Sequence, residues 1–154
     1  MKSLQKLGDL SGRRAIVTGG SGHIGLAVGE TLVEMGADVS VMDLSADACQ
    51  ERVDALSQLR KHDGAAIPCD LRDEQSTREA IRHGIGKMGG LDILVHTAAY
   101  IGTTQAQGWA VPFEDQGVEA WDAAMRVNLT SAFVMAQEAK TSLEDSGHGA
   151  VIFF

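Results

Sequence analysis

A glycine-rich segment near the start of the chain has the residue types and spacing that could bind a phosphate. It reads TGGSGHIG over residues 18–25. Where a strand turns sharply into a helix, several unpaired backbone N–H groups and the positive end of the helix dipole point at one spot. Glycine suits such a turn because it tolerates positive φ and has no Cβ to hold the phosphate away. The candidate diphosphate-binding residues are Thr18, Gly19, Ser21, Gly22, His23, Ile24 and Gly25.

An acidic residue, Asp43, lies 18 residues beyond Gly25 and ends the second apolar segment of the chain. An acidic residue at about this distance from a glycine turn is typical of dinucleotide-binding folds. Its carboxylate can accept hydrogen bonds from both ribose hydroxyls of an adenosine, and its charge would repel a 2′-phosphate. We therefore expect NAD in preference to NADP. The alternative is that Asp43 only caps the next helix, although Ser45 is available for that purpose.

The elements that must position these residues alternate along the chain. Apolar residues at helical spacing predict three helices between short apolar segments, and a longer helix from Val118 to about Asp145. Such alternation predicts an α/β fold, namely a Rossmann-type doubly wound parallel sheet with helices on both faces. We expect one NAD-binding domain over residues 1–154, incomplete at its C-terminus and truncated after the fifth strand. The predicted strands cover residues 14–18, 38–42, 65–69, 91–95 and 149–154.

Composition and charge limit the class of protein. The 154 residues are 44% hydrophobic and 22% charged, which suits one soluble domain with a core. A formal net charge of -8 argues against nucleic acid as a partner, because phosphate binding needs clustered Lys and Arg. Cys49 and Cys69 lack the spacing of a metal site, so no metal is expected. No segment has the length of a membrane span or the pattern of a signal peptide, so we expect no membrane partner and a cytoplasmic protein.

The segment over residues 100–117 interrupts the alternation of strands and helices. It carries Trp109 and Phe113 among polar residues and glycines. Loops of this length are usually functional, so we expect this one to border a substrate pocket. The histidines at predicted helix ends and in loops are expected to be solvated surface residues: His62, His83 and His148.

Taken together, these segments resemble the short-chain dehydrogenase/reductase family over essentially the whole chain. The glycine segment is similar to the family's TGxxxGxG loop, although His23 stands where a glycine is usual and Gly22 gives TGxxGxxG spacing. The resemblance implies an NAD-dependent oxidoreductase that transfers a hydride between the nicotinamide and a secondary alcohol or ketone. It also implies a small-molecule substrate and a homodimer or homotetramer.

Two further segments occupy positions that bind the cofactor in this family. Residues 69–71, CDL, match an acidic position after the third strand, where Asp70 is implied to accept a hydrogen bond from the adenine amino group. A helix-capping Asp is the alternative. Residues 96–99, HTAA, occupy the place of the family's NNAG motif, which supports the sheet and lies beside the cofactor's ribose. The residues carried over from these two segments are Asp70, Leu71, Thr97, Ala98 and Ala99.

Residues 119–129, EAWDAAMRVNL, resemble the family's helix that leads to a structural and catalytic Asn. In relatives that Asn disturbs the helix locally and holds a water in a proton relay, which is the role implied for Asn128. Asn prefers helix caps, so its mid-helix position is informative even without the family. The alternative is an exposed helix Asn with no special role.

The family's proton-donating residues do not occur in this sequence. The family has a Ser after the fifth strand and a Tyr-x-x-x-Lys pair on the next helix. Here Phe154 is the last residue, and the only tyrosine, Tyr100, is followed four residues later by Thr104. We therefore expect the natural polypeptide to be longer and this portion alone to be inactive. The alternatives are a non-catalytic dinucleotide-binding or dimerisation module and a methyltransferase with a similar sheet, which would leave the surroundings of Asn128 unexplained.

Overall fold

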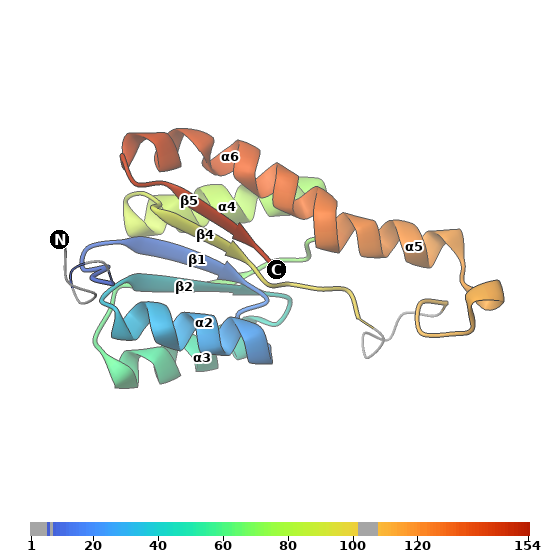
Figure 1. Ribbon diagram of the computed structural model, residues 1–154, viewed down its shortest axis with the longest axis horizontal. Helices are drawn as coiled ribbons and strands as arrows, with labels where there is room; N and C mark the ends of the chain where they lie inside the picture. Colours follow the sequence, from blue (N-terminus) through green and yellow to red (C-terminus); the bar gives the residue numbers. More distant parts are fainter. Residues whose placement is uncertain (1–5, 7, 102–107) are drawn as a thin grey trace.

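The computed structural model of the protein describes residues 6, 8–101 and 108–154. Five strands form one parallel sheet in the order β3-β2-β1-β4-β5 (Figure 1). The chain builds outward from β1 in one direction and then continues on the other side of β1, which is the predicted doubly wound arrangement. The strands are β1 (Arg14–Thr18), β2 (Asp38–Asp43), β3 (Ala66–Pro68), β4 (Ile93–His96) and β5 (Ala150–Phe153).

Helices cover both faces of this sheet, as the alternation of elements predicted. Figure 1 shows α2 and α3 on one face and α4 and α6 on the other, while α5 extends beyond the end of the sheet. The predicted helix from Val118 has the expected extent, but a π-helical turn divides it into α5 and α6. The helical elements are α2 (His23–Glu34), α3 (Ala46–Leu59), α4 (Glu74–Met88), η1 (Phe113–Asp115), α5 (Val118–Met125), η2 (Arg126–Thr130) and α6 (Ser131–Asp145).

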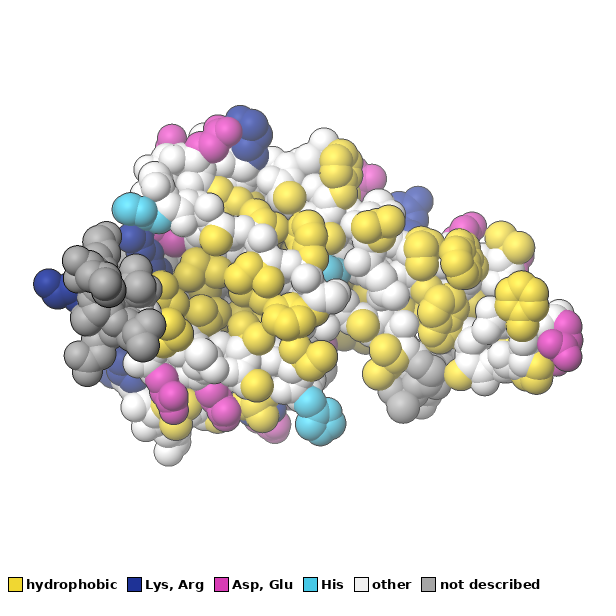
Figure 2. All heavy atoms as spheres, in the orientation of Figure 1, with side chains coloured by type: hydrophobic (Ala, Val, Ile, Leu, Met, Phe, Trp, Pro, Cys, Tyr) yellow, Lys and Arg dark blue, Asp and Glu magenta, His cyan; other side chains and the backbone are white. Residues whose placement is uncertain are grey.

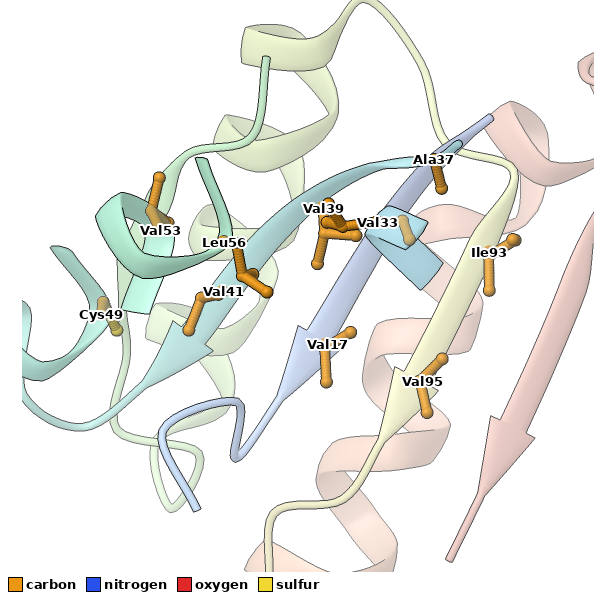
Figure 3. Close-up of a cluster of buried hydrophobic side chains, with 11 residues drawn as sticks. Val17, Val33, Ala37, Val39, Val41, Cys49, Val53, Leu56, Ile93 and Val95 are labelled. Carbon is orange, nitrogen blue, oxygen red and sulfur yellow. The ribbon is translucent and has the colours of Figure 1, made fainter. Parts of the chain in front are cut away.

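Successive side chains of each strand enter two separate hydrophobic cores. Val17 of β1 packs with Val39, Val41 and Leu56 on the face covered by α2 and α3 (Figure 3). Ile16 points the other way, into the core beneath α4 and α6. Burial on both faces explains why the strands appear in the sequence as short apolar runs. The two cores hold all carboxyl ends of the strands at one edge of the sheet.

The helices differ in how their first turns are capped. The Ser45 hydroxyl accepts a hydrogen bond from the Ala48 N–H (3.2 Å) at the start of α3. The Asp73 carboxylate accepts one from the Ser76 N–H (2.6 Å) at the start of α4. By contrast, α2 begins after Gly22, which has no side chain to accept such a bond, and its first turn contains no acidic residue. The first turn of α2 therefore lacks the internal acceptors that the other two helices have.

The expectation that His62 is solvated is wrong. Its side chain is buried, and Nδ1 accepts a hydrogen bond from the Gly64 N–H (2.9 Å) in the connection between α3 and β3. Burial is the main cause that lowers the pKa of His62. His83 and His148 are exposed, as predicted. A polar connection of this kind shows no hydrophobic pattern, so the sequence gives no sign that it folds back onto β2.

Candidate functional site

The glycine turn after β1 lies against the segment that follows β4, at the point where the strand order reverses. In doubly wound sheets, ligands bind in the crevice at this switch point. The Thr97 hydroxyl donates a hydrogen bond to the Thr18 carbonyl (2.7 Å), and the Thr97 N–H donates to the same oxygen (3.2 Å). A Cβ on Gly19 would lie 2.7 Å from the Ala98 Cα, and Gly19 has a φ of +64°. The structure thus brings residues 18–25 and 97–99 together, as the sequence predicted.

Gly25 allows α2 to begin directly on the turn. A Cβ at this position would overlap the Gly19 carbonyl oxygen and lie 2.6 Å from the Gly20 Cα. The Gly22 N–H donates to the Gly19 carbonyl (3.0 Å), which closes the turn. None of the described non-glycine residues has a positive φ, so His23 occupies its place without backbone strain. The departure from the usual glycine spacing is therefore compatible with a tight turn.

Asp43 at the end of β2 holds the glycine turn in place. Its Oδ2 accepts a hydrogen bond from the Ser21 N–H (3.1 Å) and another from the Ser21 hydroxyl. Its Oδ1 accepts from the Leu44 N–H (2.7 Å). Because Ser45 caps α3, the alternative role of Asp43 as the helix cap is wrong. A ribose bound beside this carboxylate would share it with the Ser21 hydroxyl.

Arg52 of α3 also contacts the turn, which the sequence did not predict. Its Nη2 lies 3.5 Å from the Ser21 carbonyl oxygen, while its Nε is buried without a hydrogen-bond partner among the described residues. Ser21 therefore lies between a cation of α3 and the Asp43 carboxylate of β2. An arginine on a polar helix face looks like any solvated side chain in the sequence, so only the packing of α3 against the turn reveals it.

Asp70 follows β3 and pairs with a neighbouring arginine. Its carboxylate accepts hydrogen bonds from Arg72 Nη2 (2.6 Å) and Arg72 Nε (3.0 Å). The hydrogen bond from the Arg72 side chain is the main cause that lowers the pKa of Asp70. Asp73 caps α4, so the alternative role of Asp70 as the helix cap is wrong. Leu71 is half-buried and packs on the core beneath α4. Any adenine contact to Asp70 would be made in competition with Arg72.

His96 links the glycine turn to the π-helical turn. The side chain is buried, its Nδ1 lies 2.7 Å from the Thr18 hydroxyl, and its Nε2 lies 3.1 Å from the Val127 carbonyl oxygen. A carbonyl oxygen only accepts, so Nε2 carries the proton and Nδ1 accepts from Thr18. Burial is the main cause that lowers the pKa of His96, which favours this neutral form. The sequence placed His96 within the segment but assigned it no role.

Asn128 lies in the π-helical turn, beside the loop that follows β4. Its Oδ1 accepts a hydrogen bond from the Tyr100 N–H (2.7 Å). The half-buried side chain and this bond exclude the alternative of an exposed helix Asn. The turn also leaves the Val127 carbonyl to accept from the Ser131 hydroxyl (2.7 Å) and from His96. Turns of this kind are frequent at functional sites, and the helix is disturbed locally as the resemblance implied.

Tyr100, whose N–H donates to Asn128, also begins a chain of aromatic contacts with the two tryptophans. The rings of Tyr100 and Trp109 meet edge to face with centroids 5.9 Å apart, and those of Trp109 and Trp121 are 6.3 Å apart. Phe113 points into solvent instead, with 88% of its surface exposed. Residues 102–107 of the predicted pocket loop lie outside the described part of the chain. The aromatic group thus joins the loop after β4 to α5.

Comparison with known proteins places this chain in a family. The short chain dehydrogenase family model matches residues 13–154. The chain belongs to the short-chain dehydrogenase family. A rhamnolipids biosynthesis 3-oxoacyl-[acyl-carrier-protein] reductase from Pseudomonas aeruginosa is 37% identical over 84% of this chain and 47% of its own length. The chain spans about half the length of the curated short-chain dehydrogenase relatives that it matches.

Solved structures of family members include both nicotinamide dinucleotides. A 7α-hydroxysteroid dehydrogenase complexed with NADH and 7-oxo glycochenodeoxycholic acid aligns with a TM-score of 0.84 and 32% identity, over 98% of this chain and 55% of its own. A short chain dehydrogenase from Burkholderia cenocepacia in complex with NADP aligns with a TM-score of 0.77 and 34% identity, over 88% of this chain and 52% of its own. Members of the family therefore bind a nicotinamide cofactor and are oxidoreductases.

Metal and membrane sites were also sought among the described residues. No group of three or more His, Cys, Asp or Glu side chains in residues 8–101 and 108–154 is arranged to hold a metal ion. In the same part of the chain, no helix has the length and hydropathy that crossing a membrane requires.

Proposed function

We propose that the protein is an NAD-dependent oxidoreductase that transfers a hydride between the nicotinamide and a secondary alcohol or its ketone. The observation that carries this proposal is the Asp43 carboxylate, which is held against the glycine turn by Ser21 at the switch point of the sheet. We further propose a cytoplasmic enzyme with a small-molecule substrate. Residues 1–154 would form one domain that supplies the cofactor site.

The residues present fit a dinucleotide. The open first turn of α2 and the glycines that close the turn leave room for a diphosphate, which would be held by residues 18–25. Asp43 would bind the adenosine ribose, and Asp70 and Leu71 would lie beside the adenine. Residues 97–99 would lie beside the second ribose. When bound, the nicotinamide would supply or accept the hydride. Asn128 would orient a water in the proton relay while holding the Tyr100 backbone.

The preference for NAD over NADP rests on charge at the end of β2. A 2′-phosphate would bring at least one further negative charge beside the Asp43 carboxylate, whereas a ribose diol donates hydrogen bonds to it. Arg52 contacts the turn, but its Nη2 is directed to the Ser21 carbonyl. The Asp43 carboxylate is thus the group at the end of β2 to which a ribose would donate hydrogen bonds.

This proposal is tested by measuring both cofactors on one variant. Asp43→Ala removes the acceptor for the ribose, so we expect the Kd for NAD to rise about tenfold, the lower range for the loss of one hydrogen bond to a charged group. The Kd for NADP should change less, because a repulsion is lost together with the acceptor. Asp54→Ala, an exposed residue on α3, is the matched control. Equal losses of NAD and NADP affinity would refute the role of Asp43.

The exposed apolar face over β5, α5 and α6 favours a second candidate, a non-catalytic dinucleotide-binding or dimerisation module. Figure 2 shows hydrophobic side chains gathered along this part of the surface. The apolar side chains exposed there include Val118, Trp121, Leu129, Phe133, Val151, Ile152 and Phe153. In either case we propose a homodimer or homotetramer. NAD reduction measured at 340 nm with a panel of secondary alcohols, on a polypeptide with the full length of the relatives and beside sedimentation of the same sample, separates an enzyme from a module without turnover.

A further inference from the structure

His96 lies between the glycine turn and the helix that carries Asn128. It is the last residue of β4 and is paired with Thr18, the last residue of β1, in the register of the sheet. Only 1% of its surface is exposed. The ring of Phe153 on β5 packs against the imidazole edge to face, with centroids 6.1 Å apart. The imidazole is therefore enclosed where three neighbouring strands end.

The hydrogen bonds of this ring form one directed chain. The Ala98 N–H donates to the Thr18 hydroxyl oxygen (3.4 Å), which lies 2.7 Å from Nδ1 of His96. Nε2 lies 3.1 Å from the Val127 carbonyl oxygen, a group that only accepts. Burial lowers the pKa of His96 and so favours the neutral ring, in which Nε2 carries the single proton. Both ring nitrogens are then used, one toward β1 and the other toward the π-helical turn.

The segment that follows β4 is attached to the π-helical turn at two points. His96 donates to the Val127 carbonyl, and the N–H of Tyr100 donates to Oδ1 of Asn128 (2.7 Å). Because Val127 and Asn128 are adjacent, the two bonds fix both the backbone before Asn128 and its side chain. The Val127 carbonyl also accepts from the Ser131 hydroxyl (2.7 Å), but that bond stays within the helix. Of these two donors, His96 is the one that connects the turn to the sheet.

We propose that His96 is a positioning residue that holds Asn128 at a fixed place relative to the glycine turn. The inference rests on the proposed function, in which Asn128 belongs to the proton relay and the glycine turn binds the diphosphate. His96 acts through Thr18 on one side and through Val127 on the other. Loss of the Val127 contact leaves Asn128 present but no longer oriented for the relay. NAD still binds, because the Thr97 hydroxyl and N–H continue to hold the Thr18 carbonyl.

Two conservative substitutions separate the two contacts of the imidazole. The amide of Asn ends near the position of Nδ1, so His96→Asn keeps the contact to Thr18 and loses the one to Val127. The longer Gln places its amide near Nε2, so His96→Gln keeps a donor to Val127. In a polypeptide with the full length of the relatives, hydrogen exchange of the Tyr100 amide should be about tenfold faster in His96→Asn, the size of one net hydrogen bond. It should stay near the wild-type rate in His96→Gln and in the control Ser131→Ala, where His96 still satisfies the carbonyl.

A double-mutant cycle on turnover tests whether His96 acts through Asn128. His96→Asn alone should lower kcat about tenfold, as expected for Asn128→Ala, with the Kd for NAD unchanged. In the Asn128→Ala protein, the same substitution should lower kcat no further, because two residues of one network do not contribute additively. A residue that only supports the fold would add its own loss. Urea unfolding shows that each variant is folded.

The outcomes distinguish the inference from the proposed function. If NAD binds but His96→Asn and His96→Gln change the exchange of the Tyr100 amide equally, or the losses of kcat add, the inference is wrong and the cofactor site stands. If the variants do not fold, the wild-type protein decides the matter: ¹⁵N spectra should show His96 protonated at Nε2 alone, and a proton on Nδ1 would overturn the inference. A full-length protein that binds no NAD refutes the proposed function and, with it, the role of His96.

Discussion

The two edges of the sheet satisfy their polar groups in different ways. At the amino end, the buried Asp92 carboxylate pairs with Arg13 (3.2 Å) and Arg14 (2.9 Å) and also accepts from the Arg14 N–H (3.0 Å). Arg60 donates to the Gly36 carbonyl (2.8 Å) and the Ala37 carbonyl (2.6 Å) just before β2 begins. The charged groups at this edge find their partners within the chain.

At the carboxyl end, by contrast, the first turn of α2 has no capping side chain, and the Asp43 carboxylate accepts hydrogen bonds only from the hydroxyl and N–H of Ser21 and the N–H of Leu44 among the described residues, with no cation paired to it. A donor without an internal acceptor is free to bind an external one. From this difference we infer that the ion pairs at the amino end contribute to stability, and it fits our proposal that the carboxyl end binds the cofactor. Changes at the first edge should therefore alter unfolding, and changes at the second should alter ligand affinity.

The largest effect is expected from Gly25→Ala, which tests the carboxyl end. The new Cβ would overlap the Gly19 carbonyl, so the turn must shift and NAD affinity should fall about hundredfold, the upper range for forced packing at a close contact. Gly86→Ala on α4 is the matched control, because a Cβ there meets no atom within 4 Å. Calorimetric titration measures both, with circular dichroism to show that each variant is folded. Unchanged NAD affinity in a folded Gly25→Ala protein would contradict the proposed site.

A smaller effect is expected from Asp92→Asn, which tests the amino end. Burial raises the pKa of Asp92, but hydrogen bonds from Arg14 and Arg13 outweigh it, so the pKa is held below its usual value. The variant should lose about 2 kcal/mol of unfolding free energy, measured by urea denaturation at neutral pH, with NAD affinity unchanged. Asp145→Asn, exposed at the end of α6, serves as the control.

The pH dependence of the stabilisation by Asp92 provides a second test of this prediction. A lowered pKa means that the unfolded chain takes up the proton first as the pH falls. The stabilisation is complete above the unfolded pKa of about 3.9 and is lost as the pH decreases through the folded value. Wild-type and Asp92→Asn stabilities should therefore converge in acid. If Asp92→Asn lost NAD affinity but no stability, the two ends of the sheet would not differ in the way that we infer.

The smallest effect is expected from Asn128→Ala in the π-helical turn. In a polypeptide with the full length of its relatives, turnover should decrease about tenfold, which corresponds to one lost water-mediated hydrogen bond, while the Kd for NAD stays the same. Initial rates with an alcohol that the enzyme accepts measure the first quantity, and fluorescence titration the second. Thr130→Ala in the same turn is the control, and it should leave both unchanged. If Asn128→Ala turns over at the wild-type rate, Asn128 is not part of the relay.

The residues of the glycine turn were predictable because local rules place them. Gly19 has a positive φ, and Gly25 packs closely against Gly19. Ser45, just beyond β2, caps α3. The contacts of Gly25 and Ser45 are made with residues nearby in the sequence. Apolar runs and helical spacing likewise located the strands to within two residues. Such features depend on contacts over one or two turns of chain, which the pattern of residues records directly.

Long-range contacts were not predictable in the same way. His96 contacts Val127 across 31 residues, and Arg52 reaches Ser21 across the same separation. Neither contact leaves a periodic pattern in the sequence. A buried histidine or an inward-facing arginine cannot be told from a solvated one by residue type alone. The π-helical turn adds one residue to the helix without changing its apolar spacing in a recognisable way. Only the packed arrangement of the elements reveals these contacts.

The central claim, that the carboxyl end of the sheet is an open dinucleotide site, is tested most directly by calorimetric titration of the folded protein with NAD. The account predicts saturable binding of one NAD per chain, weakened about hundredfold in Gly25→Ala and retained in Asp92→Asn. No detectable affinity for NAD or NADP in a sample that unfolds cooperatively would contradict it.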